Sequence, residues 1–152
     1  MQEKEFQPKK DYYEPMHTAE HILNQTMVRM FKCSRSKNTH IERKKSKCDY
    51  VLDVMPNDQQ IIDIENKVNE IISKNLPVII ETVSIEVAKE IADLSKLPDG
   101  TDETIRIVKI GDYDTCACIG AHVKNTSEIG HFKILSHNFD NGIWRVRYRL
   151  ES

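Results

Sequence analysis

Two short motifs, one near each end of the chain, carry side chains that bind metal ions well. They are His17-Thr-Ala-Glu-His21 and Cys118-Ile-Gly-Ala-His122. Because residues four apart lie on one face of an α-helix, a single helical turn can present His17 and His21 to one ion. Three imidazoles and one thiolate form a complete tetrahedral set, and zinc is the ion that this set suits best. The sequence therefore predicts a zinc site that joins an N-terminal helix to a C-terminal loop.

Glu20 lies inside the first motif and gives it a second interpretation. The order His-x-x-Glu-His is also that of inverted-zincin peptidases, in which a glutamate can act as general base on a zinc-bound water. The chain is short for such a peptidase, and no downstream carboxylate stands out as the further ligand. Glu20 is therefore a candidate catalytic residue, with a solvent-facing position on the helix as the alternative.

The four cysteines, Cys33, Cys48, Cys116 and Cys118, are too few for a disulfide scaffold in a chain of 152 residues. Free thiols and a metal site fit a reducing compartment. The polar N-terminus has no signal-peptide pattern, and no segment approaches the roughly 18 apolar residues of a membrane span. We therefore expect a cytoplasmic protein with no membrane partner. Cys116 can be an alternative ligand, a redox partner or a buried small side chain, and the last is favoured because four better-spaced ligands fill the site.

Basic residues are unevenly distributed, although the net charge of −2 excludes a global positive field. The segment 29–47 holds eight Lys or Arg and one acid, Glu42. Arg145, Arg147 and Arg149 alternate along a predicted strand, so they share one face. Clustered cations are typical of phosphate-binding surfaces, and both patches are candidates for contact with nucleic acid. A solvated loop and a solvated strand face are the alternative.

The order of apolar patterns predicts an α+β fold with a mostly antiparallel sheet packed with helices. Residues 1–13 are predicted to form a polar arm, and residues 32–47 a hairpin or a mobile loop. Predicted helices cover 16–31, 57–75 and 86–95, and predicted strands cover 48–55, 78–85, 104–110, 130–136 and 143–150. Turns are expected at 98–100 and 140–142. At this length we expect a single domain, residues 1–152.

The residues around both motifs resemble a known family. Met16-His17-Thr-Ala-Glu-His21-Ile-Leu resembles the first motif of the editing domain of alanyl-tRNA synthetase and of its free-standing AlaX relatives. The segment from Cys118 to Gly130 resembles the second motif and its tail, a framework that the threonyl-tRNA synthetase editing domain shares. Residues 61–75 and 141–146 resemble the helix between the motifs and the closing segment. The resemblance extends over roughly residues 14–150.

This resemblance implies that the protein hydrolyses the ester bond of mischarged tRNA, with zinc held by His17, His21, Cys118 and His122. The alanine branch removes Ser from tRNA for alanine, so that substrate is expected. The chain shows no aminoacylation domain, which implies action in trans on the acceptor end of tRNA. The expected unit is an editing-type, aminoacyl-tRNA deacylase-like domain whose oligomeric state the sequence leaves open.

Selectivity for serine requires a polar group that binds the serine hydroxyl, and Thr39 or Ser36 is a candidate for this role. An ordinary loop threonine is the alternative for Thr39. The second motif also departs from the usual Cys-Gly-Gly-Thr-His of the alanine branch, because Ile119 and Ala121 replace the first Gly and the Thr. We expect Ile119 to narrow the pocket. These departures favour the rival interpretation of a catalytically weak zinc- and RNA-binding relative.

Overall fold

The computed structural model describes residues 13–92 and 104–152. Most of the predicted polar arm, the turn at 98–100 and the end of the helix predicted at 86–95 lie outside the described residues. The elements are α1 (Glu14–Phe31), β1 (Asn38–His40), β2 (Ser46–Val51), α2 (Asp58–Ser73), β3 (Val78–Ser84), α3 (Ile85–Ile91), β4 (Thr104–Ile110), β5 (Asp114–Ala117), the 3-10 turn η1 (Thr126–Glu128), β6 (His131–Asp140) and β7 (Ile143–Glu151).

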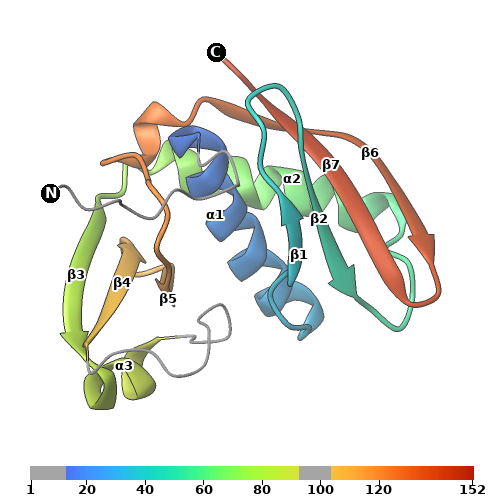
Figure 1. Cartoon of the computed structure of the whole chain (residues 1–152). Helices are drawn as coiled ribbons and strands as arrows, with labels where there is room; N and C mark the ends of the chain where they lie inside the picture. Colours follow the sequence, from blue (N-terminus) through green and yellow to red (C-terminus); the bar gives the residue numbers. More distant parts are fainter. Residues whose placement is uncertain (1–12, 93–103) are drawn as a thin grey trace, which may run out of the picture.

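The strands form two sheets, and every described pairing is antiparallel. One sheet has the order β1-β2-β7-β6 and the other the order β3-β4-β5. Helix α1 packs against α2, β7 of the first sheet and β5 of the second, so it joins the two sheets (Figure 1). The predicted α+β class with antiparallel pairing is confirmed, although the strands divide between two sheets where one was expected.

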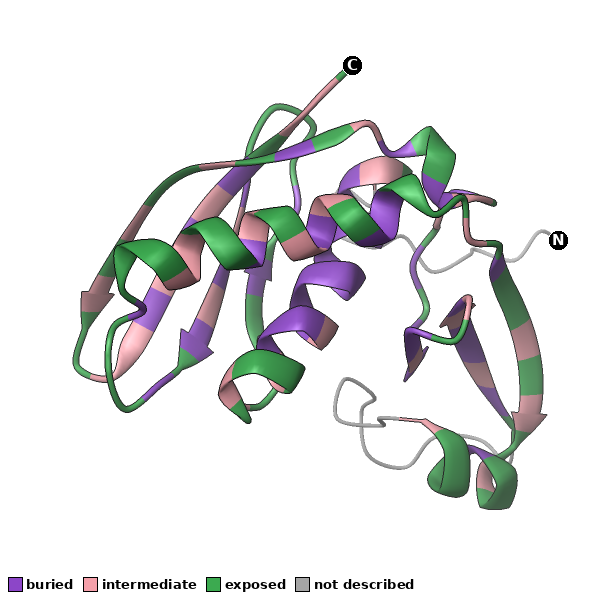
Figure 2. Cartoon of the chain, turned by 180° about the vertical axis from the view of Figure 1, so that it is seen from behind, coloured by how far each residue is buried: buried purple, intermediate pink, exposed green. Residues whose placement is uncertain are grey.

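Helix α1 is buried around its whole circumference for more than two turns. Every residue from Met16 to Asn24 is buried, and Figure 2 shows the visible part of this segment in purple behind α2. A helix start is favoured by Pro15 in the first turn, and the helix ends at Lys32, which adopts a left-handed conformation with φ of 58°. Because five of the buried residues are polar or charged, α1 needs polar partners inside the protein. These partners define the candidate site described below.

Asn57, the first residue of the predicted helix at 57–75, is the N-cap of α2. The side chain of Asn57 accepts a hydrogen bond from the Gln60 backbone at 2.8 Å, and Gln60 returns the bond to the Asn57 backbone at 2.9 Å. This capping box satisfies two backbone donors at the helix start. The buried stripe consists of Ile64, Val68, Ile71 and Ile72. Ile62, an apolar residue of the predicted helix at 57–75, is 51% exposed, because it falls on the solvent side of the helix.

The hairpin of β6 and β7 has the predicted turn. Asn141 and Gly142 both adopt positive φ angles, 53° and 79°, as a two-residue type I′ turn requires. Along β7 the side chains of Trp144, Val146 and Tyr148 are buried and alternate with the arginines on the other face. The predicted alternation of Arg145, Arg147 and Arg149 is therefore confirmed.

The strands of the structure differ from the predicted strands in extent and in number. The predicted strand at 48–55 runs instead from Ser46 to Val51, and Val54 beyond it is 74% exposed. The segment 32–47 contributes a short strand, β1, that pairs with β2 as one of the two predicted possibilities, a hairpin. Strand β5 was not predicted, because four residues are too few to show an alternating pattern. Within the two described ranges, no helix combines the length and apolar character needed to cross a membrane.

Candidate metal centre and active site

The four predicted metal ligands lie together. His17 and His21 occupy consecutive turns of α1, whereas Cys118 and His122 lie in the loop that follows β5. One ligand atom from each residue lies within 4.8 Å of the others. All four side chains are largely buried, and Nε2 of His17 lies 3.5 Å from Sγ of Cys118. This arrangement is compatible with a tetrahedral site of three nitrogens and one sulfur.

Hydrogen bonds orient two of the imidazoles. Nδ1 of His17 donates to the carbonyl oxygen of Ala121 at 2.9 Å, which leaves Nε2 with its lone pair. Nδ1 of His122 lies 2.9 Å from the Thr18 hydroxyl, which also accepts a bond from the Val123 backbone N–H. Nε2 of His122 is buried and has no hydrogen-bond partner among the described groups. A buried imidazole nitrogen without a partner is unfavourable, and a metal ion would satisfy it.

The charge states of the loop residues suit a metal ion. Burial raises the pKa of the Cys118 thiol, but the interactions with His122, His17 and His21 outweigh this effect and lower the pKa to about 2. Burial and the neighbouring His21 lower the pKa of His122 to about 3, although the Cys118 thiolate opposes them. At neutral pH these residues are therefore a thiolate and a neutral imidazole, which are the forms that bind metal.

The carboxylate of Asp114 lies close to Nδ1 of the His21 ring. Oδ2 of Asp114 lies 3.6 Å from Nδ1 of His21. The carboxylate also accepts two hydrogen bonds from Arg35, at 2.7 and 3.1 Å, and one from Gln25 at 2.7 Å. Burial raises the pKa of Asp114, but His21 and Arg35 outweigh it and hold the pKa well below the usual range. A carboxylate behind a ligating histidine fixes the ring and raises its basicity.

Sequence reasoning missed the role of Asp114 and misplaced that of Arg35. Arg35 belonged to the basic segment considered for nucleic acid, but it is only 5% exposed and bonded to Asp114. Arg29 is similarly engaged, because it donates to the backbone carbonyl of Tyr113 at 2.8 Å. The sequence offered one indication that Asp114 belongs to the site. Asp114 lies four residues before Cys118, which places both in the same short segment of the chain.

The two predicted catalytic residues are hydrogen-bonded to each other, and Glu20 lies beside the predicted metal ligands. Glu20 is 2% exposed, which rules out the solvent-facing alternative. Its Oε1 lies 3.8 Å from Nε2 of His17 and 4.0 Å from Nε2 of His21. Its Oε2 accepts hydrogen bonds from Asn24 at 3.1 Å and from the Thr39 hydroxyl at 3.2 Å. One carboxylate oxygen therefore faces the metal ligands while the other is held in place.

The polar network continues beyond Thr39. The hydroxyl of Ser36 lies 2.8 Å from that of Thr39, and the Ser36 backbone N–H donates to Asn24 at 3.2 Å. Tyr50 donates to the same Asn24 oxygen at 2.6 Å. Both candidates for the serine-binding hydroxyl, Thr39 and Ser36, are thus in one buried network with Glu20. Asn24 and Tyr50, which sequence reasoning missed, connect this network to the helix and the sheet.

The two departures in the second motif have limited contact with the buried site. Ile119 is 58% exposed, so most of its side chain lies at the surface, and the expectation that it narrows the pocket stays a prediction. Ala121 acts through its backbone carbonyl, which accepts from His17. Cys116 is buried and lies outside the group of metal-capable residues, and its thiol donates to the Ala117 carbonyl at 3.4 Å. It is the buried small side chain that was favoured.

None of the three surface clefts described for residues 13–92 and 104–152 is lined by the metal ligands. The largest, about 580 Å³, lies at the C-terminal end of α1. It is lined by residues 31–33, residues 51–55, Asn57 and Gln60. The candidate site is recognised by its chemistry, because its four donors and Glu20 converge, whereas the clefts contain no comparable cluster.

Comparison with known proteins agrees with this geometry. A family model described as the threonyl and alanyl tRNA synthetase second additional domain matches residues 105–147. The matched segment includes Cys118 and His122 as well as most of β7.

Several relatives are similar over most of the chain. The alanyl-tRNA editing protein AlaX-L of Pyrococcus horikoshii is 36% identical over 135 residues, which are 88% of this chain and 32% of that protein. The alanine–tRNA ligase of Fervidobacterium nodosum is 33% identical over 123 residues, which are 80% of this chain and 14% of the ligase. The corresponding ligase of Bacillus subtilis is 32% identical over 143 residues, or 90% of this chain and 15% of the ligase. The chain therefore spans between about a seventh and a third of the length of these relatives.

Proposed function

Because this chain belongs to the editing-domain family that threonyl- and alanyl-tRNA synthetases share with AlaX proteins, we propose that it hydrolyses mischarged aminoacyl-tRNA. The proposed substrate is Ser-tRNA for alanine, and the proposed action is in trans. One observation carries the proposal: a buried carboxylate, Glu20, lies beside four converging metal-capable side chains. We further propose that residues 1–152 form a single editing-type domain.

The proposed metal is zinc, held by His17, His21, Cys118 and His122. The donor set supports this choice, since imidazole and thiolate together suit zinc better than magnesium or calcium. The unpartnered Nε2 of His122 supports it as well. When bound, zinc would supply a fixed positive charge and Lewis acidity next to the ester.

Glu20 is the proposed general base. Its Oε1 would accept a proton from the attacking water, whose oxygen forms a bond to the ester carbonyl carbon. When the bond between that carbon and the ribose oxygen breaks, the same proton can pass from Glu20 to the ribose oxygen. Asn24 and Thr39 hold Oε2, so the carboxylate does not need to reorient during the reaction.

Thr39 is the proposed specificity residue. Its hydroxyl donates to Glu20, and the oxygen keeps the capacity to accept a hydrogen bond from the serine hydroxyl of the substrate. An alanyl group has no such donor, and a buried site built for a hydroxyl discriminates strongly against a substrate that lacks it. Ser36, 2.8 Å from Thr39, can support the same contact.

A catalytically weak zinc- and RNA-binding relative is the second candidate function, and the substitutions at Ile119 and Ala121 favour it. The exposed position of Ile119 gives this second candidate less support than a substitution inside the buried site would. The double variant Ile119→Gly with Ala121→Thr separates the two. A marked rise in deacylation over the parent protein would support the weak relative, whereas an unchanged rate supports an intact deacylase. The peptidase interpretation gains no support, because the described metal-capable group contains Cys118 and no carboxylate.

The proposed function is tested by metal content followed by deacylation of a panel of mischarged tRNAs. Protein purified without added metal should contain about one zinc per chain, and His21→Ala should lose most of it. Release of serine from tRNA for alanine supports the proposal. Zinc-loaded protein that releases no amino acid from the panel would refute the enzymatic proposal, and cleavage of peptides would favour the peptidase.

A further inference from the structure

Three side chains lie directly opposite one another across three neighbouring strands. His40 of β1 pairs with Lys47 of β2, and Lys47 pairs with Arg147 of β7. Directly opposed residues in an antiparallel sheet share one face, with Cβ atoms about 4.5–5.5 Å apart. Their buried neighbours, Thr39, Cys48 and Val146, point to the other face. We name His40, Lys47 and Arg147 the basic row.

The pairing of Lys47 with Arg147 is unfavourable by itself. Like charges directly opposite each other destabilise a sheet. In the part of the chain that the structure describes, neither side chain forms an ion pair, and the side-chain bond of Arg147 runs to the neutral hydroxyl of Ser136 at 3.4 Å. An anion bound between the two cations would offset their repulsion.

The other cations of β7 are already neutralised. Arg145 donates two hydrogen bonds to Asp49, at 2.7 and 2.8 Å, and Asp49 also accepts from Asn38. Arg149 donates to Glu151 at 2.6 and 3.1 Å. Of the three arginines that alternate along β7, Arg147 is therefore the one whose charge no described acid compensates.

The basic row borders a surface cleft of about 260 Å³. Its remaining lining residues are Lys45, Ser46 and one acid, Glu42. Lys45, Lys47 and Arg147 outweigh that acid, and His40 adds a side chain that can donate a hydrogen bond. The volume is several times the roughly 30 Å³ that a water molecule occupies in the liquid, so a phosphate group fits.

The row also lies close to the candidate active site along the chain. Thr39, whose hydroxyl donates to Glu20, immediately precedes His40 in β1, and the two side chains point to opposite faces of the sheet. Strand β1 is an edge of its sheet. A nucleic acid strand that ends beside Glu20 and passes over this edge would bring its backbone to the basic row. We propose that the basic row binds a backbone phosphate of the RNA whose 3′ end enters the site, an inference that rests on the proposed tRNA substrate.

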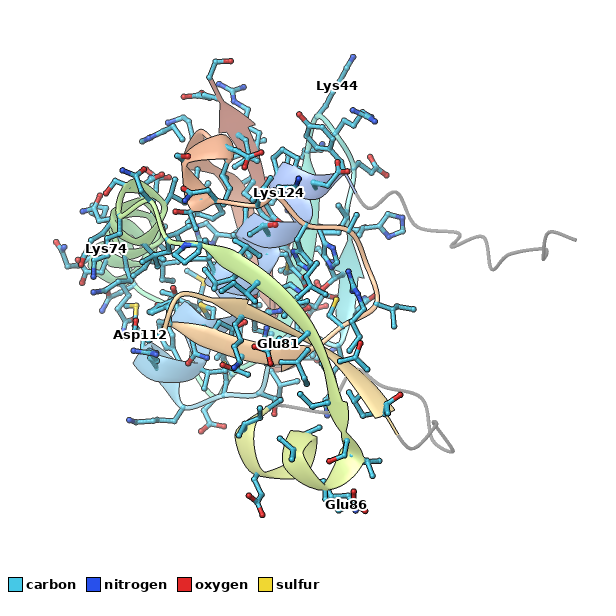
Figure 3. The ribbon with its side chains drawn as sticks, turned by 90° about the vertical axis from the view of Figure 1, so that its left-hand side faces the viewer. Lys44, Lys74, Glu81, Glu86, Asp112 and Lys124 are labelled. Carbon is cyan, nitrogen blue, oxygen red and sulfur yellow. The ribbon has the colours of Figure 1, made fainter. Side chains whose placement is uncertain are left out.

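The double variant Lys47→Gln with Arg147→Gln tests this proposal in the full chain. The matched control is Lys67→Gln with Lys74→Gln, which removes the same charge from α2 and its C-cap. Lys74 lies away from the β1–β2 hairpin, which Lys44 marks in Figure 3. Binding of uncharged tRNA for alanine is measured by fluorescence anisotropy over a range of KCl concentrations. We expect the row variant to bind about tenfold more weakly, and its slope of log affinity against log salt to fall by about 1, because one phosphate contact is lost.

A second readout separates binding from structure. Because the row variant removes a like-charge pair, its thermal unfolding midpoint without RNA should equal or exceed that of the parent protein. Affinity and salt slope that match those of the α2 control would overturn the proposal, and so would a lower midpoint with unchanged RNA binding. Deacylation of Ser-tRNA is measured in parallel. If the row variant and the parent protein deacylate Ser-tRNA at the same rate, the proposed phosphate contact is refuted and the deacylase function is not. If RNA binding depends on the row but no protein deacylates Ser-tRNA, the deacylase function is refuted and the phosphate contact is not.

Discussion

Nδ1 of His17 donates a hydrogen bond to the carbonyl oxygen of Ala121 at 2.9 Å, across 104 positions of sequence. The contact joins the first motif to the backbone of the second, so the two halves of the proposed metal centre are held together by the protein itself. It also fixes the tautomer of His17 that keeps Nε2 available for a metal ion. The residue at position 121 therefore contributes through its backbone, which explains how Ala121 can occupy that position.

The support of His21 by Asp114 predicts the effect of Asp114→Asn. Loss of the negative charge 3.6 Å from Nδ1 should weaken zinc binding roughly 10- to 100-fold, because the ligating ring becomes less basic and less firmly oriented. Affinity is measured by competition with a chromophoric chelator, and circular dichroism verifies folding. The control Asp112→Asn changes an exposed acid two residues away and should leave affinity unchanged. Equal affinity in both variants would show that Asp114 serves only its ion pair with Arg35.

Zinc affinity should rise with pH. Burial lowers the pKa of His21, but Asp114 and Cys118 outweigh it and raise the pKa to about 9 in the metal-free protein. Zinc must displace this proton, so affinity should increase about tenfold per pH unit between pH 7 and pH 9 and level off above. Cys118 and His122, with pKa values of about 2 and 3, add no dependence in this window. A flat profile from pH 7 to pH 9 would contradict this assignment.

Much of this site could be predicted from the sequence because its signals are local. The spacing of His17 and His21 places both on one helical face, and the Asn141-Gly142 pair specifies a hairpin turn. The support of His21 could not be predicted, because Arg35 and Asp114 meet across 79 positions of sequence. The burial of Glu20 depends on the elements packed around α1, which no helical pattern reveals.

Thr39→Val should change substrate selectivity without removing the metal. Valine has nearly the same shape but no hydroxyl, so it removes the bond to Glu20 and the proposed acceptor for serine. We expect kcat/KM for Ser-tRNA to fall at least tenfold relative to that for Ala-tRNA, with zinc content unchanged. Thr82→Val, at an exposed position of β3, is the control. A variant that keeps the parent's ratio of rates would exclude Thr39 as the specificity residue.

The proposed general-base mechanism is best tested by comparing Ser-tRNA and Ala-tRNA for alanine as substrates of the zinc-loaded protein and of Glu20→Gln. This mechanism predicts that the parent protein releases serine much faster than alanine. It also predicts that Glu20→Gln loses at least a hundredfold in rate, the contribution typical of a general base, while it keeps its zinc. Equal release of serine and alanine by the parent protein, or full activity of Glu20→Gln, would contradict it.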